Sequence, residues 1–311
     1  MHKNCILVGG SGFLGLNVAV GLISAGYKVT IVDKRSFCPE YFPEVTKKID
    51  FIRMDYHGSE ALKNALRGKD VLFHFASLSL PGTSMDSMDN DIRDDVLGSI
   101  KLFKLAHRAG VKKIVFPSSG GTVYGDSDQL PINEKKSTNP ISSYGVIKLT
   151  IENYLFLFNK IYGMEYLIYR LSNPYGPGQN PNGEQGLITK SIYNMLTGLP
   201  ITVFGNGKNL RDYMFIEDAV AAFVAGMKQD LKNDIYNVGS GKGYTINEVI
   251  KIASEVAGIK PEVKYLKKRQ IDVTANILDT TKFRSETGWR AKVSLEKGIK
   301  NTYEWVKKRV S

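Results

Sequence analysis

Three glycines near the start of the chain constrain its fold more than any other feature. A short apolar run, Cys5–Val8, leads into Gly9, Gly12 and Gly15, and a helical pattern follows at once. A strand, a tight turn and a helix in this order are typical of a nucleotide-binding turn. Gly9 permits the turn, Gly12 lets the backbone approach a pyrophosphate, and Gly15 lets the helix pack closely on the strand. We therefore predict a dinucleotide site here, with its pyrophosphate at the positive end of the helix dipole.

An acidic residue follows at the spacing that such a turn requires. Asp33 ends the second apolar run, 18 residues after Gly15. Its carboxylate would accept hydrogen bonds from both adenosine ribose hydroxyls and repel a 2′-phosphate, which predicts NAD rather than NADP. The adjacent Lys34 and Arg35 are the residues that would favour NADP instead. The other predicted cofactor contacts are Phe13, Leu14, Asp55, Tyr56, Phe75 and Ala76; for Asp55 and Tyr56, a simple polar loop is an equally good interpretation.

The first ~170 residues alternate short apolar runs with helical patterns, which is typical of a doubly wound parallel sheet. We predict a Rossmann-type α/β fold with a smaller C-terminal α/β substrate-binding lobe. The NAD-binding domain is predicted over residues 1–172 and the nucleotide-sugar-binding lobe, interleaved with it, over 173–311. The Gly- and Pro-rich segment 173–183 is predicted to be a loop without regular structure. The predicted strands are Cys5–Val8, Lys28–Val32, Phe51–Arg53, Val71–Ala76, Lys113–Pro117, Tyr166–Tyr169 and one near Asn276–Leu278.

Composition and charge exclude several classes of function. The formal net charge is +11, but the basic residues are spread along the chain, so we expect no nucleic-acid partner and some steering of anionic substrates. No apolar run reaches the ~18 residues of a membrane span, and the N-terminus lacks a signal-peptide pattern. Four histidines and two cysteines without ligand spacing predict no metal site. We expect a cytoplasmic protein.

A tyrosine and a lysine stand four residues apart in the predicted helix 142–162. On a helix, Tyr144 and Lys148 share one face with a rise of ~6 Å between them. An ammonium group at that distance would stabilise the phenolate and lower the pKa of Tyr144 from its ordinary value near ~10. The pair thus predicts a general base for a sugar or alcohol hydroxyl.

These features and four more motifs resemble the NAD-dependent nucleotide-sugar epimerases of the extended short-chain dehydrogenase/reductases. The further motifs are SSGGTVYGD at 118–126, RLSNPYGPGQ at 170–179, RDY at 211–213 and RQIDV at 269–273. The resemblance implies a UDP-hexose 4-epimerase with a transient 4-keto sugar, in which Asn173, Arg211 and Arg269 bind the diphosphate. Two alternatives remain: a nucleotide-sugar 4-ketoreductase and a non-catalytic nucleotide-binding scaffold. The resemblance also implies a homodimer, formed by the helices predicted over 96–109 and 143–162.

Three positions depart from the family pattern. Gly120 stands where many members carry a hydroxyl that relays the proton, so Ser119 or Thr122 would supply it, or Tyr144 would act directly. Gly121 and Thr122 replace the acidic pair of the sugar dehydratases, which disfavours dehydration. Asn276 is smaller than the tyrosine of the strict glucose/galactose members and would leave room for an N-acetyl group. A hydrogen bond from Asn276 to a neighbouring strand or loop is the equally weighted alternative.

Overall fold

The computed structural model describes residues 3–37, 41–56, 60–79, 82, 84–85, 88–183 and 185–310. The chain divides into two compact units. The first contains Met1–Ser119, Ser143–Arg170 and Val220–Tyr236, and the second contains Gly120–Ser142, Leu171–Ala219 and Asn237–Ser311. Each unit is therefore built from separate stretches of the chain. Which ligand each part binds stays a prediction.

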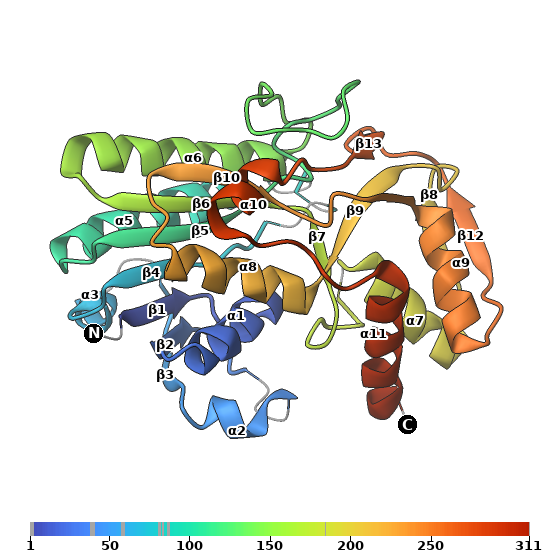
Figure 1. Ribbon diagram of the computed structural model, residues 1–311, viewed down its shortest axis with the longest axis horizontal. Helices are drawn as coiled ribbons and strands as arrows, with labels where there is room; N and C mark the ends of the chain where they lie inside the picture. The colour runs from blue at the N-terminus through green and yellow to red at the C-terminus, as the bar shows by residue number, and fades with distance from the viewer. Residues whose placement is uncertain are drawn as a thin grey trace. The chain divides into compact units, whose positions relative to one another are not determined.

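The first unit is built around a large sheet. Within the described residues this sheet has seven strands, in the order β10-β6-β5-β4-β1-β2-β3. The pairs β1–β2, β1–β4, β2–β3 and β4–β5 are parallel. The order of the strands reverses between β1 and β4, and ligands bind at the carboxyl edge of such a switch point. The predicted doubly wound fold is confirmed (Figure 1). The strands are β1 (Asn4–Val8), β2 (Lys28–Asp33), β3 (Asp50–Arg53), β4 (Val71–His74), β5 (Lys113–Ser119), β6 (Glu165–Leu171) and β10 (Asp234–Val238).

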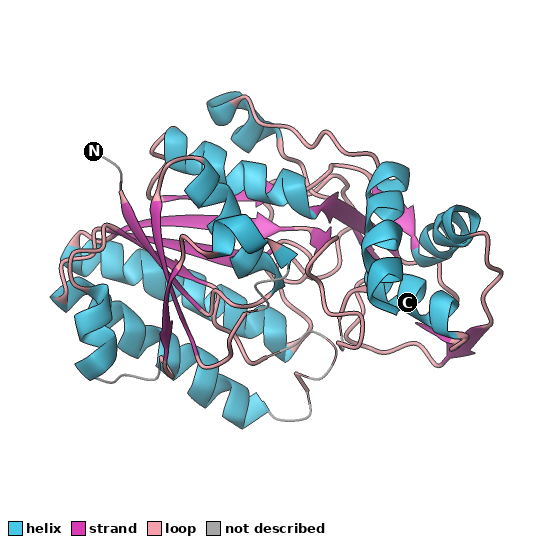
Figure 2. Ribbon diagram, turned by 90° about the horizontal axis from the view of Figure 1, so that it is seen from below, coloured by secondary structure: helices cyan, strands magenta, loops and turns pink. Residues whose placement is uncertain are grey.

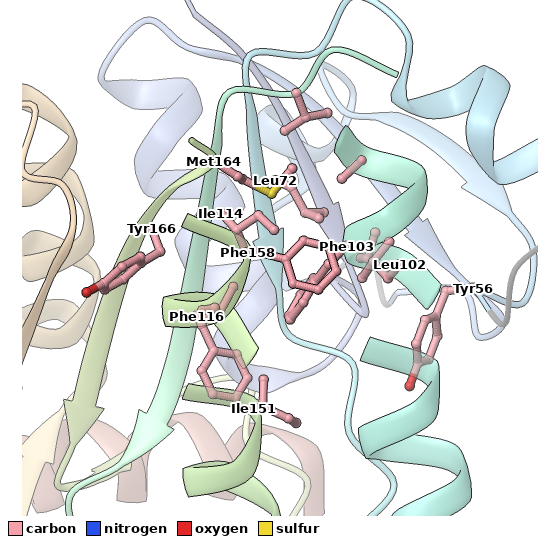
Figure 3. Packing of buried hydrophobic residues seen from close by; sticks show 14 of the residues in the cluster. Tyr56, Leu72, Leu102, Phe103, Ile114, Phe116, Ile151, Phe158, Met164 and Tyr166 are labelled. Carbon is pink, nitrogen blue, oxygen red and sulfur yellow. The ribbon is translucent and has the colours of Figure 1, made fainter. Parts of the chain in front are cut away.

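Helices cover both faces of this sheet (Figure 2). The core on one face packs α3 (Glu60–Leu66), α5 (Gly98–Arg108) and α6 (Ser143–Tyr162) against the strands, with Leu72, Phe103 and Ile151 among its members (Figure 3). On the other face, α1 (Phe13–Ser24) meets α8 (Ile216–Lys228), and the Phe73 ring of β4 lies 6.4 Å from that of Phe223. Neighbouring residues of β4 thus point into opposite cores, which explains why these strands are apolar throughout.

Within the described residues, the second unit contains two small sheets. One is built from β7 (Asn173–Tyr175), β9 (Leu210–Phe215), β11 (Gly243–Thr245) and β13 (Ala275–Asn276). The other pairs β8 (Ile201–Phe204) with β12 (Val263–Leu266) in parallel. The helices α7 (Leu187–Thr197), α9 (Ile246–Ala257) and α11 (Leu295–Val310) pack against one another, and α10 (Thr281–Thr287) precedes α11.

Several predicted boundaries need correction. The strand predicted over Val71–Ala76 ends at His74, and the strand predicted near Asn276–Leu278 covers Ala275–Asn276. The segment 173–183 is not wholly irregular, because its first three residues form β7 beside β9. Pro174 has no N–H to donate, and it is tolerated because β9 is the only strand that β7 pairs with among the described residues. The helix predicted from Val96 is an α-helix only from Gly98, and a π-helical segment, η2 (Ile92–Leu97), precedes it. Short helices, α2 (Pro43–Thr46) and α4 (Met88–Asp91), complete the first unit.

Helix ends at glycine were predicted correctly. Gly26 and Gly110 adopt the left-handed conformation, with φ of +91° and +84°, just after α1 and α5. Within the described ranges, no helix is long and apolar enough to cross a lipid bilayer.

Candidate active site

The glycine turn lies against the segment that follows β4. Gly9 has φ of +78°, and a Cβ atom on it would overlap the backbone of Ala76. The backbone N–H groups of Phe75 and Ala76 both donate to the carbonyl of Val8, at 2.8 and 2.9 Å. The structure therefore brings together three predicted cofactor residues, Gly9, Phe75 and Ala76, at the carboxyl ends of β1 and β4.

The other two glycines of the turn differ in what surrounds them. A Cβ on Gly15 would lie 2.7 Å from the Cα of Gly10, so close packing of the helix requires this glycine. A Cβ on Gly12 would meet only the Gly9 carbonyl oxygen, 4.0 Å away. Gly12 is exposed, and no acidic residue occupies the first turn of α1, which begins with Phe13 and Leu14. Open space in front of unopposed N–H groups fits a pyrophosphate.

A substitution at Gly12 tests this fit. Gly12 has φ of −73° and ψ of 173°, which alanine adopts without strain. Gly12→Ala should therefore leave the free energy of unfolding unchanged or raise it by roughly 0.4–1 kcal/mol. The added methyl group would occupy the space predicted for the pyrophosphate, so NAD affinity should fall by about tenfold or more, or ~1.4 kcal/mol. Calorimetric titration of NAD into stripped protein measures this; undiminished affinity would place the pyrophosphate elsewhere.

Asp33, the predicted ribose ligand, ends β2 beside the glycine turn. One carboxylate oxygen accepts the backbone N–H of Ser11 and the other accepts that of Arg35, both at 3.0 Å. The first bond ties the end of β2 to the glycine turn. The side chains of Lys34 and Arg35 are exposed. Each carboxylate oxygen keeps a further lone pair with which it can accept a ribose hydroxyl.

Asp55 and Tyr56 are placed differently from each other. Asp55 is exposed, whereas Tyr56 is only 9% exposed and belongs to the core cluster on the α5–α6 face. The Tyr56 hydroxyl donates to the backbone carbonyl of Asp94 at 3.1 Å. This position leaves little of the Tyr56 ring to cover an adenine. Contact of either residue with the cofactor stays a prediction.

Tyr144 and Lys148 lie on one face of α6, as their spacing predicted. The Lys148 ammonium nitrogen is 5.5 Å from the centre of the Tyr144 ring and 4.9 Å from that of Phe116. It donates to the carbonyl of Pro117 at 3.4 Å. The side chain of Ser119, at the end of β5, forms a hydrogen bond with Tyr144. Ser119 is thus one hydroxyl that the structure brings to the candidate base.

Burial dominates the protonation of this pair. Desolvation raises the pKa of the Tyr144 hydroxyl, the charge of Asp95 raises it further, and the hydrogen bond with Ser119 opposes them. The pKa of Tyr144 is therefore raised, whereas the spacing to Lys148 predicted a lowered pKa. Desolvation also lowers the pKa of Lys148 to about 8, against the charges of Asp95 and Glu152. The phenolate therefore depends on added positive charge nearby.

Thr122 and Asn276 belong to the second unit. The Thr122 hydroxyl is buried and has no hydrogen-bond partner among the described residues. Asn276 is fully buried; its amide nitrogen donates to the Gly120 carbonyl at 2.8 Å, and its amide oxygen has no partner in the described part of the chain. The geometry of Asn276 favours the hydrogen-bonding interpretation, and its predicted role beside the sugar stays a prediction.

The three predicted diphosphate contacts also lie in the second unit. The Asn173 amide donates to the Asp212 carbonyl at 2.9 Å, which links β7 to β9. Arg211 donates to the Leu210 carbonyl at 2.8 Å, and burial lowers the pKa of its guanidinium. The Arg269 guanidinium is held by Asp272 through two bonds of 2.9 and 2.8 Å. Because its fork is engaged, Arg269 would have to share its donors with a phosphate.

Two buried acids near Lys148 carry no motif and were not singled out in the sequence. Glu152 lies one turn beyond Lys148 on α6, and Asp95 lies in η2. Glu152 forms an ion pair with Arg170, whose terminal nitrogen is 2.6 Å from a carboxylate oxygen. The i, i+4 spacing from Lys148 was a signal for Glu152. Nothing in the local sequence distinguishes Asp95 from its acidic neighbours.

The chain is similar in sequence and in structure to known proteins. The sequence model of the NAD dependent epimerase/dehydratase family matches residues 5–239. A putative UDP-glucose 4-epimerase of Methanocaldococcus jannaschii is 34% identical, over 97% of this chain and 98% of that protein. A dTDP-4-dehydro-6-deoxyglucose reductase of Escherichia coli is 31% identical over 96% of both chains. The crystal structure of a UDP-glucose 4-epimerase of Thermotoga maritima with UDP-glucose has a TM-score of 0.92 and 34% identity, covering 99% of this chain and 100% of that one.

Proposed function

Because the chain belongs to the NAD-dependent epimerase/dehydratase family, we propose that it is a 4-epimerase of a UDP-hexose. The observation that carries the proposal is the group formed by Tyr144, Ser119 and Lys148 in the first unit. The similarity to proteins named UDP-glucose 4-epimerase supports it over nearly the whole chain. The reaction passes through a transient 4-keto sugar.

The residues of the first unit divide the chemistry between them. The glycine turn and Asp33 would hold NAD, whose nicotinamide would supply the hydride chemistry at C4. Tyr144, as phenolate, takes the proton of the 4-hydroxyl and later gives it back. Ser119 hydrogen-bonds the tyrosine oxygen and orients it toward the sugar hydroxyl. Lys148 offsets the desolvation of the phenolate with its charge.

The second unit supplies the anchor for the substrate. Asn173, Arg211 and Arg269 bind the diphosphate, and guanidinium groups suit this because they donate in bidentate fashion. Epimerisation requires that the sugar present either face of C4 after oxidation. Firm binding of UDP with few fixed contacts to the hexose meets that requirement.

Proton NMR of the purified protein with a panel of nucleotide sugars tests the function. UDP-glucose, UDP-galactose and their N-acetyl counterparts are incubated separately, without added cofactor, alongside dTDP- and GDP-hexoses. An epimerase converts one UDP-hexose into a mixture with its 4-epimer, because the cofactor is regenerated in each turnover. A ketoreductase, the activity named for the Escherichia coli relative, instead requires a 4-keto sugar and stoichiometric reduced cofactor. No conversion of any UDP-hexose would contradict the proposal.

The relay hydroxyl can be identified by two matched substitutions. Ser119 hydrogen-bonds Tyr144, whereas the Thr122 hydroxyl has no partner among the described residues. A hydrogen bond to a charged group contributes about 1.5–3 kcal/mol, so Ser119→Ala should lower kcat by roughly 10- to 100-fold. Thr122→Val should change kcat much less. If both variants and their double mutant retain near-normal kcat, Tyr144 acts without a relay.

We propose that two copies of the chain associate through α5 and α6. The outer side of α6 exposes apolar side chains at helical spacing, among them Val146, Leu157 and Ile161, which is 60% exposed. Leu97, just before α5, is 47% exposed. A patch of this kind is typical of a contact between helices of two subunits. Sedimentation velocity should therefore give a dimer, with the monomer as the contradicting result.

A further inference from the structure

The ammonium group of Lys148 is buried with little to compensate its charge. The residue is 5% exposed, and the only hydrogen bond of the ammonium within the described chain is the 3.4 Å bond to the Pro117 carbonyl. It forms no ion pair with a carboxylate of the described residues. The rings of Phe116 and Tyr144 beside the ammonium carry no full charge. A buried cation without an anionic partner is costly and tends to lose its proton. An anion nearby has to hold the proton on Lys148.

Glu152 is not free to serve as that anion. Arg170 binds it through three hydrogen bonds of 2.6, 3.1 and 3.2 Å, two from its Nε and one from a terminal nitrogen. The Ser118 hydroxyl donates to the same carboxylate. The charges of Glu152 and Arg170, both almost fully buried, therefore compensate each other.

Asp95 is a buried anion that no cation contacts among the described residues. It is 1% exposed, and its carboxylate accepts hydrogen bonds from the Ser77 hydroxyl at 2.8 Å and the backbone N–H groups of Leu78 and Ser79 at 2.8 and 3.1 Å. These donors stabilise a charged carboxylate, but none of them is a cation. No ion pair with Asp95 occurs among the described residues. One buried anion and one buried cation are thus left without a neutralising partner in direct contact.

We propose that Asp95 is a positioning residue that supplies the counter-charge for the Lys148 ammonium. The inference rests on the proposed function for its catalytic meaning, because a charged Lys148 matters there to the Tyr144 phenolate. The geometry supports it, because η2, which carries Asp95, packs against α6, which carries Lys148. The electrostatic interactions agree: Asp95 is the first of the charges that raise the pKa of Lys148. The same carboxylate holds the loop 77–79, which follows the Phe75–Ala76 segment beside the glycine turn.

The neighbouring titratable groups do not replace Asp95. His74 on β4 is fully buried, and burial, followed by the charge of Lys148, lowers its pKa to about 3, so it stays neutral. Tyr56 faces Asp95 from the loop after β3, and burial raises the pKa of its hydroxyl. Glu152, on α6, is paired with Arg170. Tyr144 itself is the remaining group and stays protonated in the absence of added positive charge.

Direct titration of Lys148 tests the proposal without any substrate. The protein is labelled with ¹³Cε-lysine, and the Lys148 resonance is assigned by its loss in Lys148→Met. NAD content is matched between samples. In the wild-type protein Lys148 should be protonated at pH 7. In Asp95→Asn, which keeps the shape and removes the charge, the titration midpoint should fall by about one pH unit or more.

Asp94→Asn is the matched control, because it removes the same charge from the adjacent residue of η2. It should leave the midpoint near the wild-type value. An unchanged midpoint in Asp95→Asn, or an equal fall in Asp94→Asn, would overturn the proposal. A wild-type midpoint below pH 7 would overturn it even if Asp95→Asn does not fold.

The pH profile of activity connects this result to catalysis. If the chain epimerises UDP-hexoses, the alkaline limb of the kcat/KM profile should move to lower pH in Asp95→Asn together with the NMR midpoint. A purely structural role for Asp95 would lower kcat/KM at every pH and leave the limb in place, which would overturn the proposal. Failure of the proposed function would appear instead as an absence of turnover in the wild-type protein, with the titration unaffected.

Discussion

Tyr144→Phe is expected to lower kcat for epimerisation by a factor of about 10²–10⁴, the usual contribution of a positioned acid–base group. The substitution removes the hydroxyl that Ser119 contacts and leaves the ring beside Lys148. The chemistry loses its proton acceptor, whereas the packing of α6 does not change. Rapid-mixing or coupled assays of UDP-hexose turnover measure the loss.

Two controls separate this effect from damage to the fold. The variant should retain its NAD and should unfold close to the wild-type temperature, because the ring keeps its packing and only the hydroxyl has been removed. Tyr154→Phe, on the same helix, should leave kcat unchanged. Turnover of Tyr144→Phe within about threefold of wild type is far outside the expected range and would show that another group is the base.

Glu152→Ala is expected to reduce the free energy of unfolding by about 3–5 kcal/mol, the cost of leaving a buried charge without its partner. Arg170 is 4% exposed and gives its Nε and one terminal nitrogen to Glu152, so alanine deprives this buried guanidinium of the Glu152 carboxylate. Ser118 loses the acceptor of its hydroxyl as well. Equilibrium unfolding in urea, with saturating NAD, measures the change.

An exposed ion pair elsewhere in the chain provides the matched control. Glu255 on α9 is paired with Lys251 at 3.9 Å, and both side chains are more than half exposed. Glu255→Ala should change the free energy of unfolding by no more than about 0.5 kcal/mol. Similar effects of the two substitutions would mean that the Glu152–Arg170 pair does not stabilise the first unit.

The sheet of the first unit was predictable because its signals are local. Strands covered on both faces must be apolar throughout, so β1, β2 and β4 stand out in the sequence. Gly26 and Gly110 mark helix ends because few other residues adopt their positive φ. By contrast, β7 is three residues long and contains Pro174, and it is a strand only because β9 lies beside it. That information is not local.

In the candidate site, too, the features set by local sequence could be predicted and those set by the fold could not. The spacing of Tyr144 and Lys148 places them on one helical face, and this was readable from the sequence. Their burial was not, so the sign of the Tyr144 pKa shift was predicted wrongly. Asp95 comes from a different helix and is distinguished only by what surrounds it. The engagement of Arg269 by Asp272 likewise depends on the conformation of the segment between them.

The fate of the hydrogen on C4 tests the proposed reaction most directly. UDP-glucose carrying deuterium at C4 is incubated with the purified protein in ordinary water, and the product is analysed by NMR and mass spectrometry. We predict UDP-galactose that retains the deuterium at C4, because the hydride removed from the sugar is returned to it. Product that has exchanged its deuterium for solvent hydrogen, or no 4-epimer at all, would contradict 4-epimerisation by oxidation and reduction at C4.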